Sequence, residues 1–130
     1  MNITIDTSAL LAVIVGESVR EKIIALTAGN TLLAPGSVPW EIGNAFSAMF
    51  KRDRITLKEA QKGISIFNGI PIRYIETDFA NALKVSRTAN IYAYDAYMLD
   101  CAMQSKTPLL TLDGKLLEAA RKLGIESLEV

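Results

Sequence analysis

The stretch Asn2-Ile3-Thr4-Ile5-Asp6-Thr7-Ser8 leads directly into the apolar segment at residues 9–15. Isoleucine alternates with polar residues at positions 2–5, as in a half-buried β-strand. The Asp, Thr and Ser that follow favour the first position of a helix. A strand that passes so directly into a helix is the start of a βα unit, and we therefore expect an α/β fold.

The same alternation of short apolar runs and longer helical patterns continues along the chain. Capping boxes at Ser18 with Glu21 and at Thr56 with Glu59 predict two helix starts, and Ser37 can cap a third. Further strands are expected at about 31–34, 71–75, 109–112 and 125–130, and further helices at about 19–27, 38–49, 56–68, 78–88, 94–105 and 115–123. About five short strands and about seven helices predict an α/β protein with a mainly parallel sheet, because helical crossovers join parallel strands.

The composition limits both the architecture and the chemistry. The 130 residues, half of them apolar and with 14 basic against 14 acidic side chains, suit one domain over residues 1–130. The absence of histidine excludes Ser-His-Asp triads and histidine-based zinc sites. The lone cysteine, Cys101, is expected to be a buried thiol. The apolar run at 9–15 is shorter than the roughly 20 residues that cross a bilayer, and no secretory signal is recognisable, so we expect a cytoplasmic protein without a membrane segment.

Two aspartates directly follow predicted strands, Asp6 after Ile5 and Asp113 after residues 109–112. Ligands of parallel α/β sheets bind beyond the carboxyl ends of the strands. Each aspartate taken alone is better explained as a helix cap or a turn residue. Without histidine, however, catalysis would have to use carboxylates, hydroxyls, Lys or Arg, or a hard metal ion such as Mg²⁺.

Two further acids lie near predicted helix starts. Asp95 shares a helix face with Met98 and Leu99, so its carboxylate is expected to face the core, where an unpaired charge is costly. A helix cap explains Asp95 equally well, and Asp100 on the opposite face is expected to be solvated. Glu41 alone is best explained as an acid favoured by the positive end of its helix. Four acids would converge on one cleft only with a cation to neutralise them.

Four segments in order carry a resemblance to a known family: Ile5-Asp6-Thr7-Ser8, Glu41 with Asn44, Tyr94-Asp95-Ala96, and Leu110-Thr111-Leu112-Asp113. Over essentially its whole length the chain resembles the PIN-domain ribonucleases, especially the VapC-type toxins of prokaryotic toxin/antitoxin modules. The resemblance implies a PIN-like three-layer sandwich. It also implies that the site is an acidic tetrad of Asp6, Glu41, Asp95 and Asp113.

The resemblance assigns a role to each residue of that site. Asp6, Asp95 and Asp113 would hold Mg²⁺ or Mn²⁺, directly or through waters, and Glu41 would orient or deprotonate the attacking water. The supporting residues would be Ser8, Thr111 and Asn44. The additional acid that some members carry after the last aspartate has no counterpart, because Leu116 and Leu117 stand there.

The implied activity is metal-dependent endoribonuclease cleavage of RNA by a toxin that a small antitoxin holds inactive. A homodimer is also expected. A net charge of zero provides no general attraction to nucleic acid. Local phosphate contacts are therefore expected from Lys51, Arg52, Arg54 and Lys58, although a solvated basic face is the simpler explanation. Apolar residues of an antitoxin groove or of a dimer interface could include Val13, Ile14, Ile64, Ile66 and Phe67, for which ordinary core packing is the default.

A different class of function remains open. A non-catalytic α/β binding module could use the same acids as a pocket for a cation or a basic peptide without cleaving anything. The presence of all four matching acids favours the nuclease.

Overall fold

The computed structural model describes all 130 residues, which form one four-stranded sheet and seven helices. The strands are β1 (Asn2–Ile5), β2 (Thr31–Pro35), β3 (Ile72–Ile75) and β4 (Leu109–Leu110). The helices are α1 (Thr7–Val15), α2 (Arg20–Thr27), α3 (Val38–Lys51), α4 (Leu57–Asn68), α5 (Phe79–Ala89), α6 (Ala93–Ser105) and α7 (Gly114–Lys122). Every strand pair is parallel, in the order β3-β2-β1-β4, which confirms the predicted parallel α/β fold.

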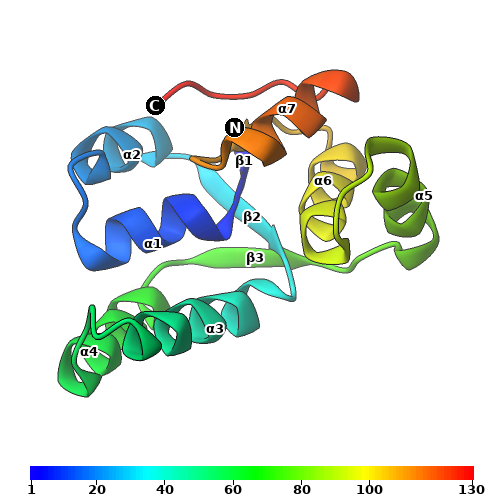
Figure 1. The fold of residues 1–130 in the computed structure, drawn as a ribbon. Helices are drawn as coiled ribbons and strands as arrows, with labels where there is room; N and C mark the ends of the chain where they lie inside the picture. Colours follow the sequence, from blue (N-terminus) through cyan, green and yellow to red (C-terminus); the bar gives the residue numbers. More distant parts are fainter.

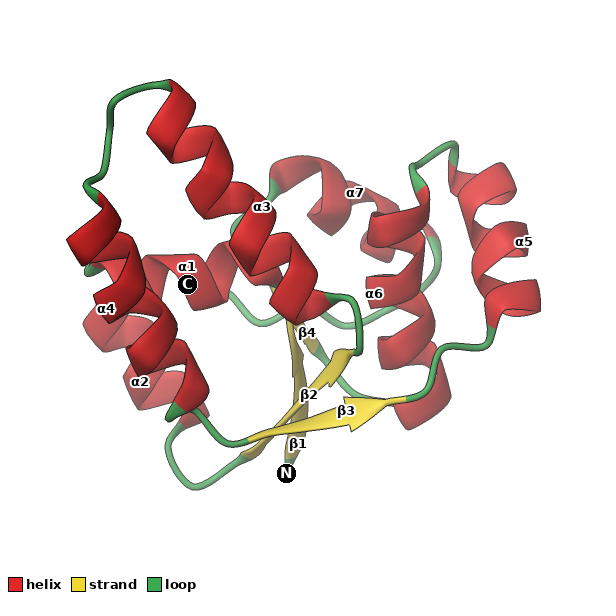
Figure 2. Ribbon diagram, turned by 90° about the horizontal axis from the view of Figure 1, so that it is seen from below, coloured by secondary structure: helices red, strands yellow, loops and turns green.

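The sheet lies between two groups of helices (Figures 1 and 2). On one side α1 contacts α2, α3 and α4. On the other side α6 packs on β1 and β2, and α5 packs on α6 in turn. This arrangement confirms the three-layer sandwich, and it places α6 between the sheet and a second helix.

The register of the sheet positions the ends of two neighbouring strands. Ile5 of β1 pairs with Leu110 of β4, and both side chains are buried. The next residues, Asp6 and Thr111, therefore leave the sheet at the same edge. Thr4 and Ile3 are also buried, so the central strand is fixed by packing on both of its faces.

The predicted fifth strand at residues 125–130 is reduced to a single bridge between Leu109 and Ser127. The Leu109 N–H donates to the Glu126 carbonyl at 2.8 Å, and the Leu128 N–H donates to the Leu109 carbonyl at 2.9 Å. Because β4 is only two residues long, it offers the terminal segment too little backbone for a longer ladder. The sheet therefore has four strands where about five were expected.

The predicted caps have different outcomes. Thr56 and Glu59 form the expected capping box at the start of α4. The box predicted at Ser18 is wrong, because α2 begins at Arg20 without a side-chain cap and Glu21 pairs with Arg20 at 3.0 Å instead. The capping patterns thus predicted the helix starts to within a residue, but the side-chain cap itself formed only at Thr56.

Two other expectations concern the burial of Cys101 and membrane-spanning helices. Cys101 is buried, as predicted, and burial raises the pKa of its thiol to about 11. No helix combines the length and the apolar character that a bilayer crossing requires.

Candidate functional site

Asp6 joins the end of β1 to the start of α1 and is only 4% exposed. Its carboxylate accepts hydrogen bonds from the Ala9 N–H at 3.0 Å and from the Ser8 hydroxyl at 2.7 Å. The Thr111 hydroxyl donates to its other oxygen. Asp6 is therefore the N-cap of α1, and its second oxygen faces the neighbouring strand end.

The hydroxyls of Ser8 and Thr111 connect this strand end to the turn that contains Asp113. Ser8 Oγ accepts the Leu112 N–H at 2.9 Å, and Thr111 Oγ1 accepts the Asp113 N–H at 2.9 Å. The Asp113 side chain is exposed and caps α7 by accepting the Lys115 N–H at 2.9 Å. The two strand-end aspartates thus share one hydrogen-bonded frame.

Glu41 lies in the first turn of α3, and its two oxygens have different partners. The Ser37 hydroxyl donates to Oε2 at 2.8 Å, and the Thr7 hydroxyl donates to Oε1 at 3.2 Å. The sequence predicted that Ser37 caps the helix with its side chain. This prediction is wrong, because the Ser37 hydroxyl donates to the Glu41 carboxylate one turn later. The Thr7 contact attaches α3 to the start of α1.

Asp95 and Asp100 of α6 differ from what the helical pattern predicts. The N-cap of α6 is Tyr92, so the explanation of Asp95 as a cap is wrong, and Asp95 is partly exposed in the first turn. The expectation that Asp100 is solvated is also wrong, because the residue is fully buried. Its carboxylate accepts hydrogen bonds from Asp78 N at 3.0 Å, Asn81 Nδ2 at 2.7 Å and Gln104 Nε2 at 2.7 Å. The reason is the packing of α5 on the outer side of α6.

The four acids influence one another electrostatically. Burial raises the pKa of Asp6, hydrogen bonds from Thr111, Ser8 and Ala9 oppose the rise, and the Asp113 charge adds to it. Burial raises the pKa of Glu41, and the charges of Asp6 and Asp95 raise it further. Burial and the Asp113 charge raise the pKa of Asp95.

No basic side chain compensates this charge. The ion pairs of the protein are Arg20 with Glu21 and Lys122 with Glu118, and neither includes an acid of the cluster. Unpaired carboxylates that are partly desolvated are energetically unfavourable unless a cation joins them. The structure thus leaves the cluster with an excess of negative charge at the carboxyl ends of β1 and β4.

The donor set fits a hard cation. Carboxylate and hydroxyl oxygens suit Mg²⁺ or Mn²⁺, and the protein has no histidine and only a buried cysteine for softer ions. No three acidic or cysteine side chains already stand together in an arrangement that could hold a metal ion. A cation here would therefore rest on few direct protein ligands, which is common for Mg²⁺ because it retains several waters.

A cavity of about 470 Å³ lies beside Glu41. Asn44, which is exposed and one turn after Glu41, belongs to its lining. The other lining residues are Thr7, Trp40, Ala45 and Tyr94. The sequence reasoning did not single out Trp40, although an aromatic residue next to a candidate acid in the first turn of a helix was the available signal.

The predicted basic residues lie apart from the acids. Lys51, Arg52, Arg54 and Lys58 are all exposed where α3 ends and α4 begins. Because a helix rises about 1.5 Å per residue, Lys51 lies roughly 15 Å along α3 from Glu41. Figure 2 shows this connection at the far end of α3 from the sheet. These residues therefore form a separate basic surface.

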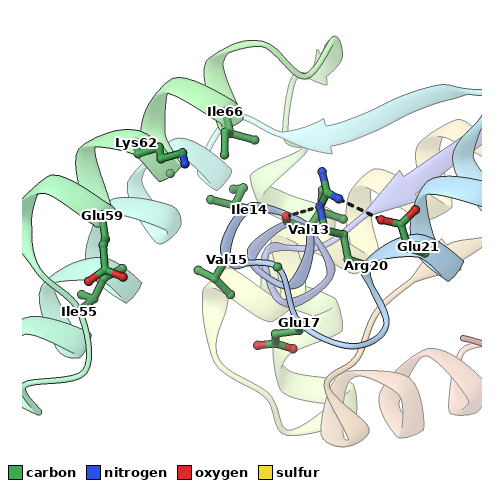
Figure 3. A pocket seen from close by; sticks show the side chains of 12 residues that line it. Val13, Ile14, Val15, Glu17, Arg20, Glu21, Ile55, Glu59, Lys62 and Ile66 are labelled. Carbon is green, nitrogen blue, oxygen red and sulfur yellow. Dashed lines mark hydrogen bonds and ion pairs between the residues drawn. The ribbon is translucent and has the colours of Figure 1, made fainter.

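A second cavity, of about 620 Å³, is lined by residues of α4, the end of α1 and the start of α2 (Figure 3). Its apolar lining includes Val13, Ile14 and Ile66, whereas Ile64 and Phe67, which the sequence grouped with them, are not part of it. The charged lining residues are Glu17, Arg20, Glu21, Glu59 and Lys62. We refer to this cavity as the α1/α4 groove.

Comparisons of this fold with solved structures find similar chains. PAE2754 from Pyrobaculum aerophilum has a TM-score of 0.66 and 22% identity, over 92% of this chain and 79% of that one. VapBC2 from Rickettsia felis, solved bound to a DNA fragment from their promoter, has a TM-score of 0.65 and 16% identity over 98% of each chain. Mycobacterium tuberculosis VapC20, described as a sarcin-ricin loop cleaving toxin, has a TM-score of 0.65 and 13% identity, over 98% of this chain and 99% of that one.

At these identities the structural likeness establishes the fold. No curated protein sequence matches the chain. The sequence profile of the PIN domain, in contrast, matches residues 3–122, which is nearly the whole chain and includes all four acids. The chain therefore belongs to the PIN domain family.

Proposed function

We propose that this PIN-domain protein is a Mg²⁺- or Mn²⁺-dependent endoribonuclease and the toxin of a toxin/antitoxin pair. The observation that carries the proposal is the group of four carboxylates, Asp6, Glu41, Asp95 and Asp113, which lack a basic partner. Their mutual charges contribute to the raised pKa values of Asp6, Glu41 and Asp95. A divalent cation is the partner that would relieve this repulsion.

In this proposal Asp6, Asp95 and Asp113 hold the cation, directly or through waters, so that it has few direct protein ligands. When bound, the ion would lower the pKa of a water molecule and offset negative charge in the transition state of phosphodiester hydrolysis. Ser8 and Thr111 orient the Asp6 carboxylate through the hydrogen bonds described above, which is the role of residues behind the metal ligands.

Glu41 is the residue we assign to the attacking water. Its raised pKa brings the carboxylate closer to the range that suits a general base near neutral pH. Thr7 and Ser37 each donate to one of its oxygens, which fixes the direction of the remaining lone pairs. Glu41 would therefore orient the water and accept its proton while the three aspartates bind the ion.

RNA is the substrate class that the resemblance to the PIN-domain ribonucleases implies. The likeness in fold to VapC20, a toxin that cleaves the sarcin-ricin loop, supports this choice. The exposed basic surface at Lys51, Arg52, Arg54 and Lys58 could bind phosphates of an extended substrate. An enzyme of this kind would act in the cytoplasm.

The α1/α4 groove is the surface that we propose for a small antitoxin. It combines apolar side chains such as Val13 and Ile66 with charged residues of both signs, so an amphipathic segment could bury its apolar side there. The likeness to VapBC2 supports a partner of this kind. Formation of a homodimer stays a prediction.

Cleavage of purified total RNA tests the enzymatic proposal. Wild-type protein should cleave RNA with Mg²⁺ or Mn²⁺ and not with EDTA, and Asp95→Asn should abolish the cleavage because it removes a ligand charge with little change in shape. Asp78→Asn is the matched control, since Asp78 is an exposed N-cap of α5 outside the acid cluster and asparagine caps equally well.

The outcomes separate the nuclease from its alternative. Equal cleavage by wild type and Asp95→Asn would show that another site or a contaminant is responsible. Saturable Mg²⁺ binding with no cleavage of any RNA would instead favour an acidic binding module.

A further inference from the structure

Two large aromatic side chains are exposed in the cavity that Glu41 also lines. Trp40 is 74% exposed and Tyr94 is 53% exposed, yet both line the same cavity of about 470 Å³. Trp40 lies on α3 immediately before Glu41, and Tyr94 lies on α6 immediately before Asp95. Each aromatic residue is therefore the chain neighbour of a proposed site residue, on a different helix.

The cavity also has polar atoms that could recognise a ligand. Asn44 is exposed, and it lies four residues after Trp40 and so on the same side of α3. Its amide offers both donors and an acceptor. Thr7 and Glu41 supply the remaining polar lining. A cavity with aromatic and polar walls suits a flat, partly polar ligand better than a purely apolar one.

The aromatic wall on α6 is held in place. Tyr94 packs edge to face on Tyr97, with ring centroids 5.8 Å apart, and Tyr97 packs in the same way on Phe79 of α5 at 5.5 Å. Such pairs fix the orientation of a ring. Tyr92, only two residues earlier, is 89% exposed and does not line the cavity.

We propose that this cavity binds one unpaired nucleobase of the substrate, against Trp40 and Tyr94 and within reach of the Asn44 amide. The proposal rests on the proposed ribonuclease function for the identity of the substrate. Proteins recognise single-stranded RNA by stacking splayed bases on aromatic side chains and by hydrogen bonds to the base edges. The position beside Glu41 would place a nucleotide next to the attacked phosphodiester, so the cavity would select the nucleotide at the cleavage site.

Tryptophan fluorescence gives a direct test, because Trp40 is the only tryptophan in the chain. Eight-nucleotide RNAs of a single base type are titrated into the wild-type protein in EDTA, which keeps the RNA intact. We expect a saturable change in Trp40 fluorescence with at least one of the single-stranded RNAs. A duplex of the same length should produce a much smaller change, because paired bases do not present their faces.

Variants test the two walls and the amide. Fluorescein-labelled RNA reports binding by anisotropy, so Trp40 itself can be changed. Trp40→Ala and Tyr94→Ala should weaken binding by about 5- to 150-fold, the range for loss of one base–aromatic stack. Trp40→Phe should recover most of the affinity because it keeps a ring, and Asn44→Ala should change the preference among the four bases. Tyr92→Ala is the matched control and should bind like wild type.

The results also separate this proposal from the proposed function. A protein that cleaves RNA but shows no change in Trp40 fluorescence, or binds duplex equally well, would overturn the base site alone. Equal losses in Tyr92→Ala and Tyr94→Ala would also overturn it, since they would indicate a general aromatic surface. Base-dependent fluorescence in a protein without RNA cleavage would support the base site and refute the nuclease. Because both aromatic residues are exposed, their variants should melt close to wild type.

Discussion

Asp95 and Asp100 lie five residues apart on α6, and their surroundings are opposite in kind. Asp100 is fully buried and accepts three hydrogen bonds, from Asp78, Asn81 and Gln104. Asp95 is partly exposed, and only burial and the charge of Asp113 raise its pKa. One carboxylate is satisfied by the protein, and the other has its lone pairs available for something else.

The difference teaches how a structural acid can be told from a candidate functional one. A buried carboxylate that contributes to the fold has donors from several elements, as Asp100 does on α6 and at the start of α5. A carboxylate proposed to serve a ligand is close to other acids, whether it is short of donors, as Asp95 is, or buried and hydrogen-bonded, as Asp6 is. Burial alone would have selected the wrong residue.

The largest expected effect is a contrast between two variants: Asp95→Ala should lose activity but keep its stability, and Asp100→Ala should lose stability but keep its activity. Asp95→Ala should reduce RNA cleavage by more than the roughly 10- to 100-fold loss typical of an indirect support of a metal ligand. Its unfolding free energy should stay at or above that of wild type, because a repelled charge is removed. Asp100→Ala should lower the unfolding free energy by about 1–3 kcal/mol, because it leaves donors without an acceptor.

Cleavage assays measure the activity of the two variants, and urea unfolding measures their unfolding free energy. Asp100→Ala should retain its activity per folded molecule. Similar losses of stability in both variants would break the distinction between the two acids.

A smaller effect is expected when the residue that orients the Asp6 carboxylate, Thr111, is changed. Thr111→Val removes the hydroxyl that donates to Asp6 and accepts from the Asp113 N–H. Mg²⁺ affinity, measured by calorimetry, should fall by about 10- to 100-fold. Thr107→Val is the control, because its hydroxyl bonds Thr4 at 2.7 Å in a buried pair outside the cluster. An equal loss of Mg²⁺ affinity in both variants would mean that disruption of the core weakens binding, and not the loss of the hydrogen bond that orients the Asp6 carboxylate.

Mg²⁺ should also stabilise the folded protein, because the unfolded chain does not assemble the acids. At a concentration of about 100 times the Kd the gain is about 2.7 kcal/mol, which a thermal melt at matched ionic strength would detect. Asp6→Asn should lose this gain, and Asp78→Asn should keep it. An unchanged melting temperature of the wild type would argue against a cation among these carboxylates.

The smallest effect is the pH dependence of the metal-free protein. The pKa of Asp6 is raised from 3.8 in the folded state, so the folded state binds more protons than the unfolded state between the two values. The contribution of Asp6 to stability is therefore most favourable below 3.8 and is lost as the pH rises through the raised value. In EDTA, the unfolding free energy of Asp6→Asn minus that of wild type should increase with pH over this window. A difference that is independent of pH would contradict the raised pKa.

Much of the fold and part of the candidate site could be predicted from local patterns. The alternation of strands and helices and the position of Asp6 directly after a strand were correct, because hydrophobic periodicity and capping act within one or two turns. Asp113 lies three residues beyond β4, which ends at Leu110 and not at 112 as expected. The box at Thr56 formed for the same reason. Trp40 was missed, because its position beside Glu41 was the only local signal, and the cavity that it shares with Tyr94 of another helix exists only in the folded protein.

The sequence by itself determined the order of the elements, the parallel sheet and the residues that follow each strand. Only the tertiary structure decided which of these residues meet. Helix α5 buried Asp100, the Thr7 hydroxyl of α1 donates to Glu41 of α3, and the placement of α3 and α6 brought Trp40 and Tyr94 to one cavity. These contacts join residues of different elements, and the free energy that selects them comes from burial and charge across the whole domain, which no local segment contains.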